Sequence, residues 1–134
     1  MKQGRQGKGS GHLGRGELTG LGEFMRRRRE ALREADASYS LRQVAERVGV
    51  EPSYLSKVER EIVPAPSEET ILRLAAELDL DADVLLAMGG KVSSDLQDAI
   101  RKRPELFAQL IRELKDMPDR AVLRVVREVR DGSW

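Results

Sequence analysis

The feature that most constrains the fold is the stretch from Ser40 to Arg60, which reads SLRQVAERVGVEPSYLSKVER. Ser40 stands three residues before Gln43, the spacing of a capping box, in which the serine oxygen accepts the third helical N–H and the glutamine side chain reaches back to the cap. Apolar residues then recur at helical spacing on one face, at Leu41, Val44, Ala45 and Val48. Gly49 follows them, and glycine is the residue that most readily adopts the left-handed conformation in which helices end. The stretch therefore begins with one short helix.

A second short helix is predicted directly after the glycine. Pro52 suits a first helical position because its missing N–H needs no partner there. Leu55 and Val58 turn the apolar side of this helix toward the first one. Ala45, four residues before Gly49, lies where two crossing helices come closest, so that a larger side chain would hold them apart. Two short helices joined by a tight glycine turn form a helix-turn-helix; the alternative is an ordinary helical hairpin inside an all-α core.

The residues that flank this motif extend the pattern over about half of the chain. They are, with the motif, Ser40, Leu41, Val44-Ala45, Gly49-Val50, Tyr54-Leu55-Ser56, Glu59, Pro66-Ser67 and Thr70-Ile71-Leu72-Arg73-Leu74-Ala75. On these residues, roughly residues 21–88 resemble the phage-repressor-like helix-turn-helix transcriptional regulators, the XRE or Cro type. The resemblance implies an all-α, five-helix domain whose third helix, at about residues 51–60, lies in the DNA major groove.

The resemblance also assigns structural tasks to particular residues. It pairs an arginine at the position of Arg29 with the glutamate at the position of Glu59, so Glu59 is expected to maintain the fold and not to read bases. Ala45 and Gly49 belong to the same structural set. The chain departs from the family at Glu61, where the family usually has a glycine that ends the third helix.

A set of polar residues on the second and third helices is predicted to contact DNA. Lys57 can donate to guanine, Glu51 can accept from cytosine N4, and Pro52 can touch a thymine methyl group. Arg42, in the first turn of the second helix, can meet a phosphate together with the N–H groups of that helix. The full set is Arg42, Gln43, Glu51, Pro52, Ser53, Tyr54, Ser56, Lys57 and Arg60. For each of them the alternative is an ordinary exposed side chain.

Composition divides the chain into three predicted parts: 1–20, 21–90 and 91–134. The first part holds seven glycines and four Lys/Arg with almost no apolar residue, so we expect a disordered basic arm. Such an arm either adds phosphate or minor-groove contacts or is a plain flexible leader or cloning remnant. Positive charge is concentrated near the predicted reading helix, because residues 1–60 hold 13 Lys/Arg against 8 Asp/Glu. This gives phosphates an attractive surface even though the net charge is only +1.

Within 21–90, the apolar spacing predicts a first helix from Leu21 to Ala35, followed by a loop over Asp36–Tyr39. Ser67 is expected to cap the fourth helix and Asp81 a short fifth one. The residues of the fifth helix expected to point inward are Val84, Leu85 and Met88.

In the third part, 91–134, the sequence pattern predicts about three short amphipathic helices, with breaks at Pro104 and Pro118. Its apolar stripes comprise Leu106, Phe107, Leu110, Ile111, Leu114, Val122, Val125, Val126 and Val129. Because a segment of this size can form only a small core of its own, its apolar stripes must be covered by the first domain, by a protein partner or by a second copy. We expect dimerisation, because recognition by such domains uses two half-sites.

The composition argues against other function classes. The chain has no cysteine, its only histidine is His12, and it carries no glycine-rich phosphate loop, so we expect no enzyme, no metal and no cofactor. No apolar run approaches the ~20 residues of a membrane span, and the start of the chain lacks the apolar region of a secretory signal. We therefore expect a cytoplasmic, dimeric repressor that binds a palindromic double-stranded operator. The alternatives are the antitoxin of a toxin–antitoxin pair, whose last helices bind the toxin, and a pure protein-interaction module.

Overall fold

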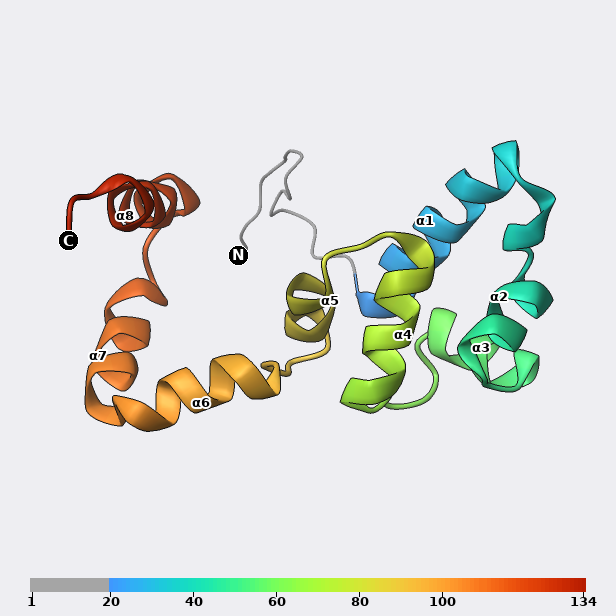
Figure 1. Ribbon diagram of the computed structural model, residues 1–134, viewed down its shortest axis with the longest axis horizontal. Helices are drawn as coiled ribbons and strands as arrows, with labels where there is room; N and C mark the ends of the chain where they lie inside the picture. Colours follow the sequence, from blue (N-terminus) through green and yellow to red (C-terminus); the bar gives the residue numbers. More distant parts are fainter. Residues whose placement is uncertain (1–19) are drawn as a thin grey trace. The chain divides into compact units, whose positions relative to one another are not determined.

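The computed structural model describes residues 20–134, and all regular secondary structure in that range is helical (Figure 1). The α-helices are α1 (Leu21–Ala35), α2 (Leu41–Val48), α3 (Pro52–Glu59), α4 (Glu68–Leu78), α5 (Ala82–Met88), α6 (Ser94–Lys102), α7 (Pro104–Leu114) and α8 (Asp119–Asp131). A short 3₁₀ helix, η1 (Ala37–Tyr39), stands between α1 and α2. The prediction of an all-α chain is confirmed for these residues. The predicted arm lies, except for Gly20, outside the described residues.

The helices group into two compact units, one ending at Ser93 and one spanning Ser94–Trp134. In the first unit, α2 packs on α3 and α4, α1 packs on the same two helices, and α5 packs on α4. Their inward faces form one apolar core of Leu21, Met25, Val44, Ala45, Val48, Leu55, Val58, Ile71, Leu74, Ala75, Leu78, Leu85 and Leu86. Burial of this surface, at about 25 cal/mol per Å² of apolar area, fixes how α2 and α3 sit on the other helices.

Side-chain caps begin three of these helices. The Ser40 Oγ accepts from the Gln43 N–H at 3.2 Å, and the Ser67 Oγ accepts from the Thr70 N–H at 3.3 Å. Asp81 accepts the N–H groups of the first turn of α5. The Gln43 side chain differs from the capping-box prediction, because its Oε1 accepts from the Ser40 hydroxyl at 3.2 Å. The backbone N–H of Ser40 is already bonded to the Ala37 carbonyl.

Two local features differ from the sequence predictions. The segment 36–39, expected as a loop, contains the 3₁₀ helix η1, because the Asp36 carboxylate accepts from the Ser38 N–H at 2.9 Å and starts a tight turn. In α5, Val84 is 50% exposed and Leu86 is fully buried. A seven-residue helix has fewer than two turns, so its apolar spacing alone left the inward face undetermined.

The second unit consists of three short helices. Pro104 opens α7, and Pro118 directly precedes α8, as the sequence predicted. None of the residues from Ser94 to Trp134, all of which the structure describes, is buried. The large apolar side chains of this unit that are exposed are Leu96, Leu106, Leu110, Ile111, Met117, Leu123, Val126, Val129 and Trp134.

Candidate nucleic-acid interface

The turn between α2 and α3 sets the angle at which α3 is presented. Gly49 has φ +86°, and its N–H donates to the carbonyl oxygens of Ala45 at 2.9 Å and Glu46 at 3.2 Å. A Cβ at Gly49 would meet nothing closer than the Arg73 guanidinium at 3.5 Å, so the backbone angle and not space requires glycine. Ala45 is fully buried beneath this turn. The two helices therefore meet at a left-handed glycine turn with a buried alanine beside it.

The reading helix α3 has a clear inner and outer side. Leu55, Val58 and Glu59 are buried. Ser53, Lys57 and Arg60 follow one another at spacings of four and three residues, so they share one face, and all three are exposed. We call these three residues the outer face of α3. Glu51 at the N-cap is exposed as well, whereas the predicted contacts Pro52, Tyr54 and Ser56 are half-buried.

The start of α2 adds a second exposed group. Arg42 and Gln43 are exposed in its first turn. Within the described residues, the Arg42 and Lys57 side chains have no hydrogen-bond or ion-pair partner. Arg47, at the other end of α2, differs from Arg42 because it is bonded to Glu77 and lies 5.2 Å from the centre of the Tyr39 ring. Cations that support the fold are thus distinct from those that remain available to a ligand.

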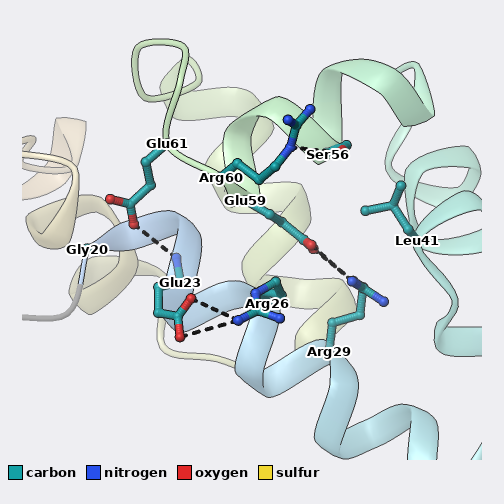
Figure 2. Close-up of a pocket in the computed structure, with 9 residues that line it drawn as sticks. All are labelled: Gly20, Glu23, Arg26, Arg29, Leu41, Ser56, Glu59, Arg60 and Glu61. Carbon is teal, nitrogen blue, oxygen red and sulfur yellow. Dashed lines mark hydrogen bonds and ion pairs between the residues drawn. The ribbon is translucent and has the colours of Figure 1, made fainter.

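A buried ion pair fixes α3 to α1. The Arg29 Nε donates to Glu59 Oε2 at 2.8 Å and its Nη2 donates to Glu59 Oε1 at 2.9 Å, as Figure 2 shows in part. The Arg29 Nη1 also donates to the Tyr39 carbonyl at 3.2 Å. The hydrogen bonds that Arg29 donates to the Glu59 carboxylate hold the pKa of Arg29 above its usual value. The pair lies on the inner side of α3, away from its outer face, and has a structural task.

Glu61, just past α3, has an unexpected position. It adopts φ +61°, the left-handed conformation that glycine usually supplies. Its carboxylate accepts a hydrogen bond from the Glu23 backbone N–H at 3.0 Å (Figure 2). Gly20, at the N-cap position of α1, supplies no side-chain cap. Glu61 therefore caps α1 from the far end of α3, a role that the sequence did not predict; an uncapped start at Gly20 was the only signal for it.

Glycines let α1 approach α3 closely at this place. A Cβ on Gly20 would lie 2.2 Å from the Glu61 carboxylate, and a Cβ on Gly22 would lie 2.2 Å from the Val58 carbonyl oxygen. An open cleft of about 820 Å³ lies at this contact. It is lined by Gly20, Glu23, Arg26, Arg29, Leu41, Ser56, Glu59, Arg60 and Glu61 (Figure 2). Most of its charged groups are already bonded to one another, as Arg26 is to Glu23. The cleft is thus part of the contact between α1 and α3, and most of its polar groups already have hydrogen-bond partners within the protein.

Two further findings apply to residues 20–134. No cluster of three or more His, Cys, Asp or Glu side chains there could hold a metal ion. None of the helices in this range has the length and apolar character needed to cross a membrane.

Comparisons with known proteins agree with this geometry. A family model described as helix-turn-helix matches residues 30–85. The chain is 39% identical over 83 residues to an uncharacterised HTH-type transcriptional regulator of Mycobacterium tuberculosis, a match that covers 59% of this chain and 55% of that relative. It is 32% identical over 72 residues to the HTH-type transcriptional regulator SinR of Bacillus licheniformis, covering 49% of this chain and 65% of that protein. The chain thus spans about half the length of the mycobacterial relative.

One solved structure is also similar. A chain of a complex of the SinR and SinI proteins aligns with 82% of this chain and 94% of its own length, at 22% identity and a TM-score of 0.44.

Proposed function

Because residues 30–85 of the chain form a domain of the helix-turn-helix family, we propose that the protein is a transcriptional regulator that inserts α3 into the major groove of double-stranded DNA. The observation that carries this proposal is the outer face of α3. Ser53, Lys57 and Arg60 project from a helix whose other side is buried, and the Lys57 ammonium has no partner among the described residues. A cation left unpaired on such a face suits a polyanion.

The proposed contacts are of two kinds: contacts to phosphates, which position the protein on the duplex, and contacts to base edges, which read the sequence. Arg42, the Gln43 side chain and the first-turn N–H groups of α2, except that of Gln43, which already donates to the N-cap serine, bind a backbone phosphate, because the start of a helix attracts anions. The half-buried Tyr54 and Ser56 contact the DNA backbone, and so does the exposed Arg60, the last residue of the outer face, at the C-cap of α3.

Base edges are read from the first part of α3. Lys57 donates to guanine O6 or N7, and Ser53 donates or accepts at a neighbouring base. Glu51 accepts from cytosine N4 and repels sequences that bring a phosphate near it. Pro52 touches a thymine methyl group through the part of its ring that remains accessible.

The proposed regulator acts as a dimeric repressor on a palindromic operator. Its second unit supports this, because Leu106 on α7 is 63% exposed and Val129 on α8 is 60% exposed, and exposed apolar stripes suit a protein interface. A second copy covers these stripes in the proposed dimer. The same surface fits a toxin in the antitoxin alternative, so the partner has to be measured.

The experiment that tests the function is selection of binding sites from random duplex DNA with the purified chain. The proposal predicts enrichment of a palindrome whose half-sites are about 10 base pairs, or ~34 Å, apart. An enriched single half-site without a palindrome would retain DNA binding and reject the dimer. No enrichment over input would reject the function.

A further inference from the structure

One face of α8 carries a row of arginines that the helix-turn-helix domain does not use. Arg120, Arg124 and Arg127, which we call the arginine stripe, are spaced by four and three residues. On an α-helix they lie within about 60° of one another and span about 10.5 Å of its axis. All three residues are exposed.

The stripe differs from most other arginines of the described residues because its guanidinium groups make no ion pair or hydrogen bond within the part of the chain that the structure describes. Arg26, Arg27, Arg28 and Arg29, the run that looks most basic in the sequence, are all bonded to carboxylates or carbonyl groups of the protein. Within residues 20–134, the guanidinium groups of Arg120, Arg124 and Arg127 have no hydrogen-bond or ion-pair partner. Arg130, in the last turn, is bonded to Asp131 and does not belong to the stripe.

The opposite face of α8 is apolar. Val122, Val125, Val126 and Val129 lie about half a turn away from the arginine stripe. Four valines on one face of a helix that has no buried residue form an apolar surface that suits contact with protein. In the proposed dimer this face is covered by protein, and the arginine stripe remains outward.

We propose that the arginine stripe of α8 is a second DNA-binding surface, which holds phosphates of the duplex outside the bases read by α3. This inference rests on the proposed function. Guanidinium groups suit phosphate because they donate bidentately and stay charged. A duplex carries one charge per about 1.7 Å of axis, so the stripe faces about six phosphate charges over its length. A membrane surface fits less well, because the apolar residues of α8 are mainly valines, with Leu123 as its one leucine, where interfacial helices have several Trp, Phe or Leu residues.

The test measures binding to random-sequence duplex DNA as a function of salt. The stripe variant carries Arg120→Gln, Arg124→Gln and Arg127→Gln, and glutamine matches arginine closely in helix propensity. The matched control carries Arg33→Gln, Arg103→Gln and Arg112→Gln, which removes the same charge from three exposed, unpaired arginines elsewhere in residues 20–134. Circular dichroism and thermal unfolding verify that both variants fold like the wild type.

The wild type is expected to bind random duplex at low salt. The stripe variant should flatten the plot of log K against log[salt] by about 2.7, because each phosphate that an arginine neutralises contributes about 0.9 to the slope. The control should stay close to the wild type. Equal slopes for the two variants would overturn the inference. So would co-sedimentation of the wild type, but not of the stripe variant, with phosphatidylserine vesicles while the DNA slope is unchanged.

The two proposals fail in different ways. If site selection returns an operator but the stripe variant has the same salt slope as the wild type, the proposal of a second DNA-binding surface is wrong and the proposed function stands. If the wild type binds neither random duplex at low salt nor any selected site, both proposals are wrong.

Discussion

Arg29 on α1 and Glu59 on α3 form a bidentate ion pair whose side chains are only 6% and 5% exposed. The pair joins the two helices across 30 residues of sequence. Because the carboxylate lies on the inner side of α3, the ion pair holds the helix while its outer face remains accessible. Stability and the proposed DNA contacts therefore depend on different residues of the same helix.

Glu59→Ala should reduce the free energy of unfolding by about 3–5 kcal/mol, because it leaves the Arg29 charge buried without its partner. Glu69→Ala is the matched control, since it breaks an exposed pair with Arg73 and should cost about 0–1 kcal/mol. Denaturant unfolding followed by circular dichroism measures both. Similar losses for the two variants would mean that burial does not govern the Arg29–Glu59 pair.

Glu61 should tolerate glycine better than alanine. Alanine removes the cap of α1, worth about 0.5–2 kcal/mol, and keeps a left-handed backbone that costs a residue with a Cβ about 1–2 kcal/mol. Glycine removes the same cap but relieves the backbone, so Glu61→Gly should be close to neutral in thermal unfolding. Asp79→Gly provides the control: Asp79 also has positive φ, at 55°, and its side chain makes only a 3.7 Å ion pair with Arg28 while almost fully exposed, so losing that pair costs little and this change should stabilise the protein. If Glu61→Gly stabilises as much as Asp79→Gly, the carboxylate cap contributes nothing.

Gly22→Ala should destabilise the first unit by about 1–3 kcal/mol, as overpacking of a close contact does. The new Cβ would lie 2.2 Å from the Val58 carbonyl oxygen and 2.7 Å from that of Glu59, and backbone cannot move aside as a side chain can. Gly89→Ala is the comparison, because its Cβ would have no neighbour nearer than 3.4 Å and its φ is −87°. Equal melting temperatures for the two variants would contradict the close approach of α1 to α3.

Ile111→Glu should convert the proposed dimer to a monomer while the helix-turn-helix domain stays folded, because it places a charge in the exposed apolar stripe of α7. Gln109→Glu adds the same charge on the polar side of α7 and should leave the mass unchanged. Sedimentation equilibrium reports the mass of each variant. A monomeric wild type, or a mass that Ile111→Glu does not alter, would argue against self-association through this stripe.

Local patterns predicted much of this fold. Apolar spacing gave Leu21 to Ala35 as the first helix, and those are the bounds of α1. Ser40 and Ser67 could be recognised as caps because each helix start carries its own signal. The pairing of Arg29 with Glu59 came from the family resemblance, since nothing in the spacing of two residues so far apart implies contact.

The features that the sequence did not predict correctly are a contact between distant residues and the inward face of a helix too short to show a period. The Glu61 cap joins residues 38 apart in the sequence. The glutamate at this position, where the family usually has glycine, indicated a departure from the family but not a contact with α1. The inward face of α5 was assigned to Val84 in place of Leu86, because seven residues do not fix a helical phase. The DNA contacts themselves rest on exposure and chemistry and are still predictions.

The most direct measurement compares Lys57→Ala and Arg42→Ala on the selected operator and on scrambled duplexes over a range of salt. Lys57→Ala should weaken operator binding by about 1–3 kcal/mol and relax preference at one base pair, whereas Arg42→Ala should weaken all sequences alike and reduce the salt slope by about 1. If both variants lose affinity equally on operator and scrambled DNA, α3 does not read bases through its outer face.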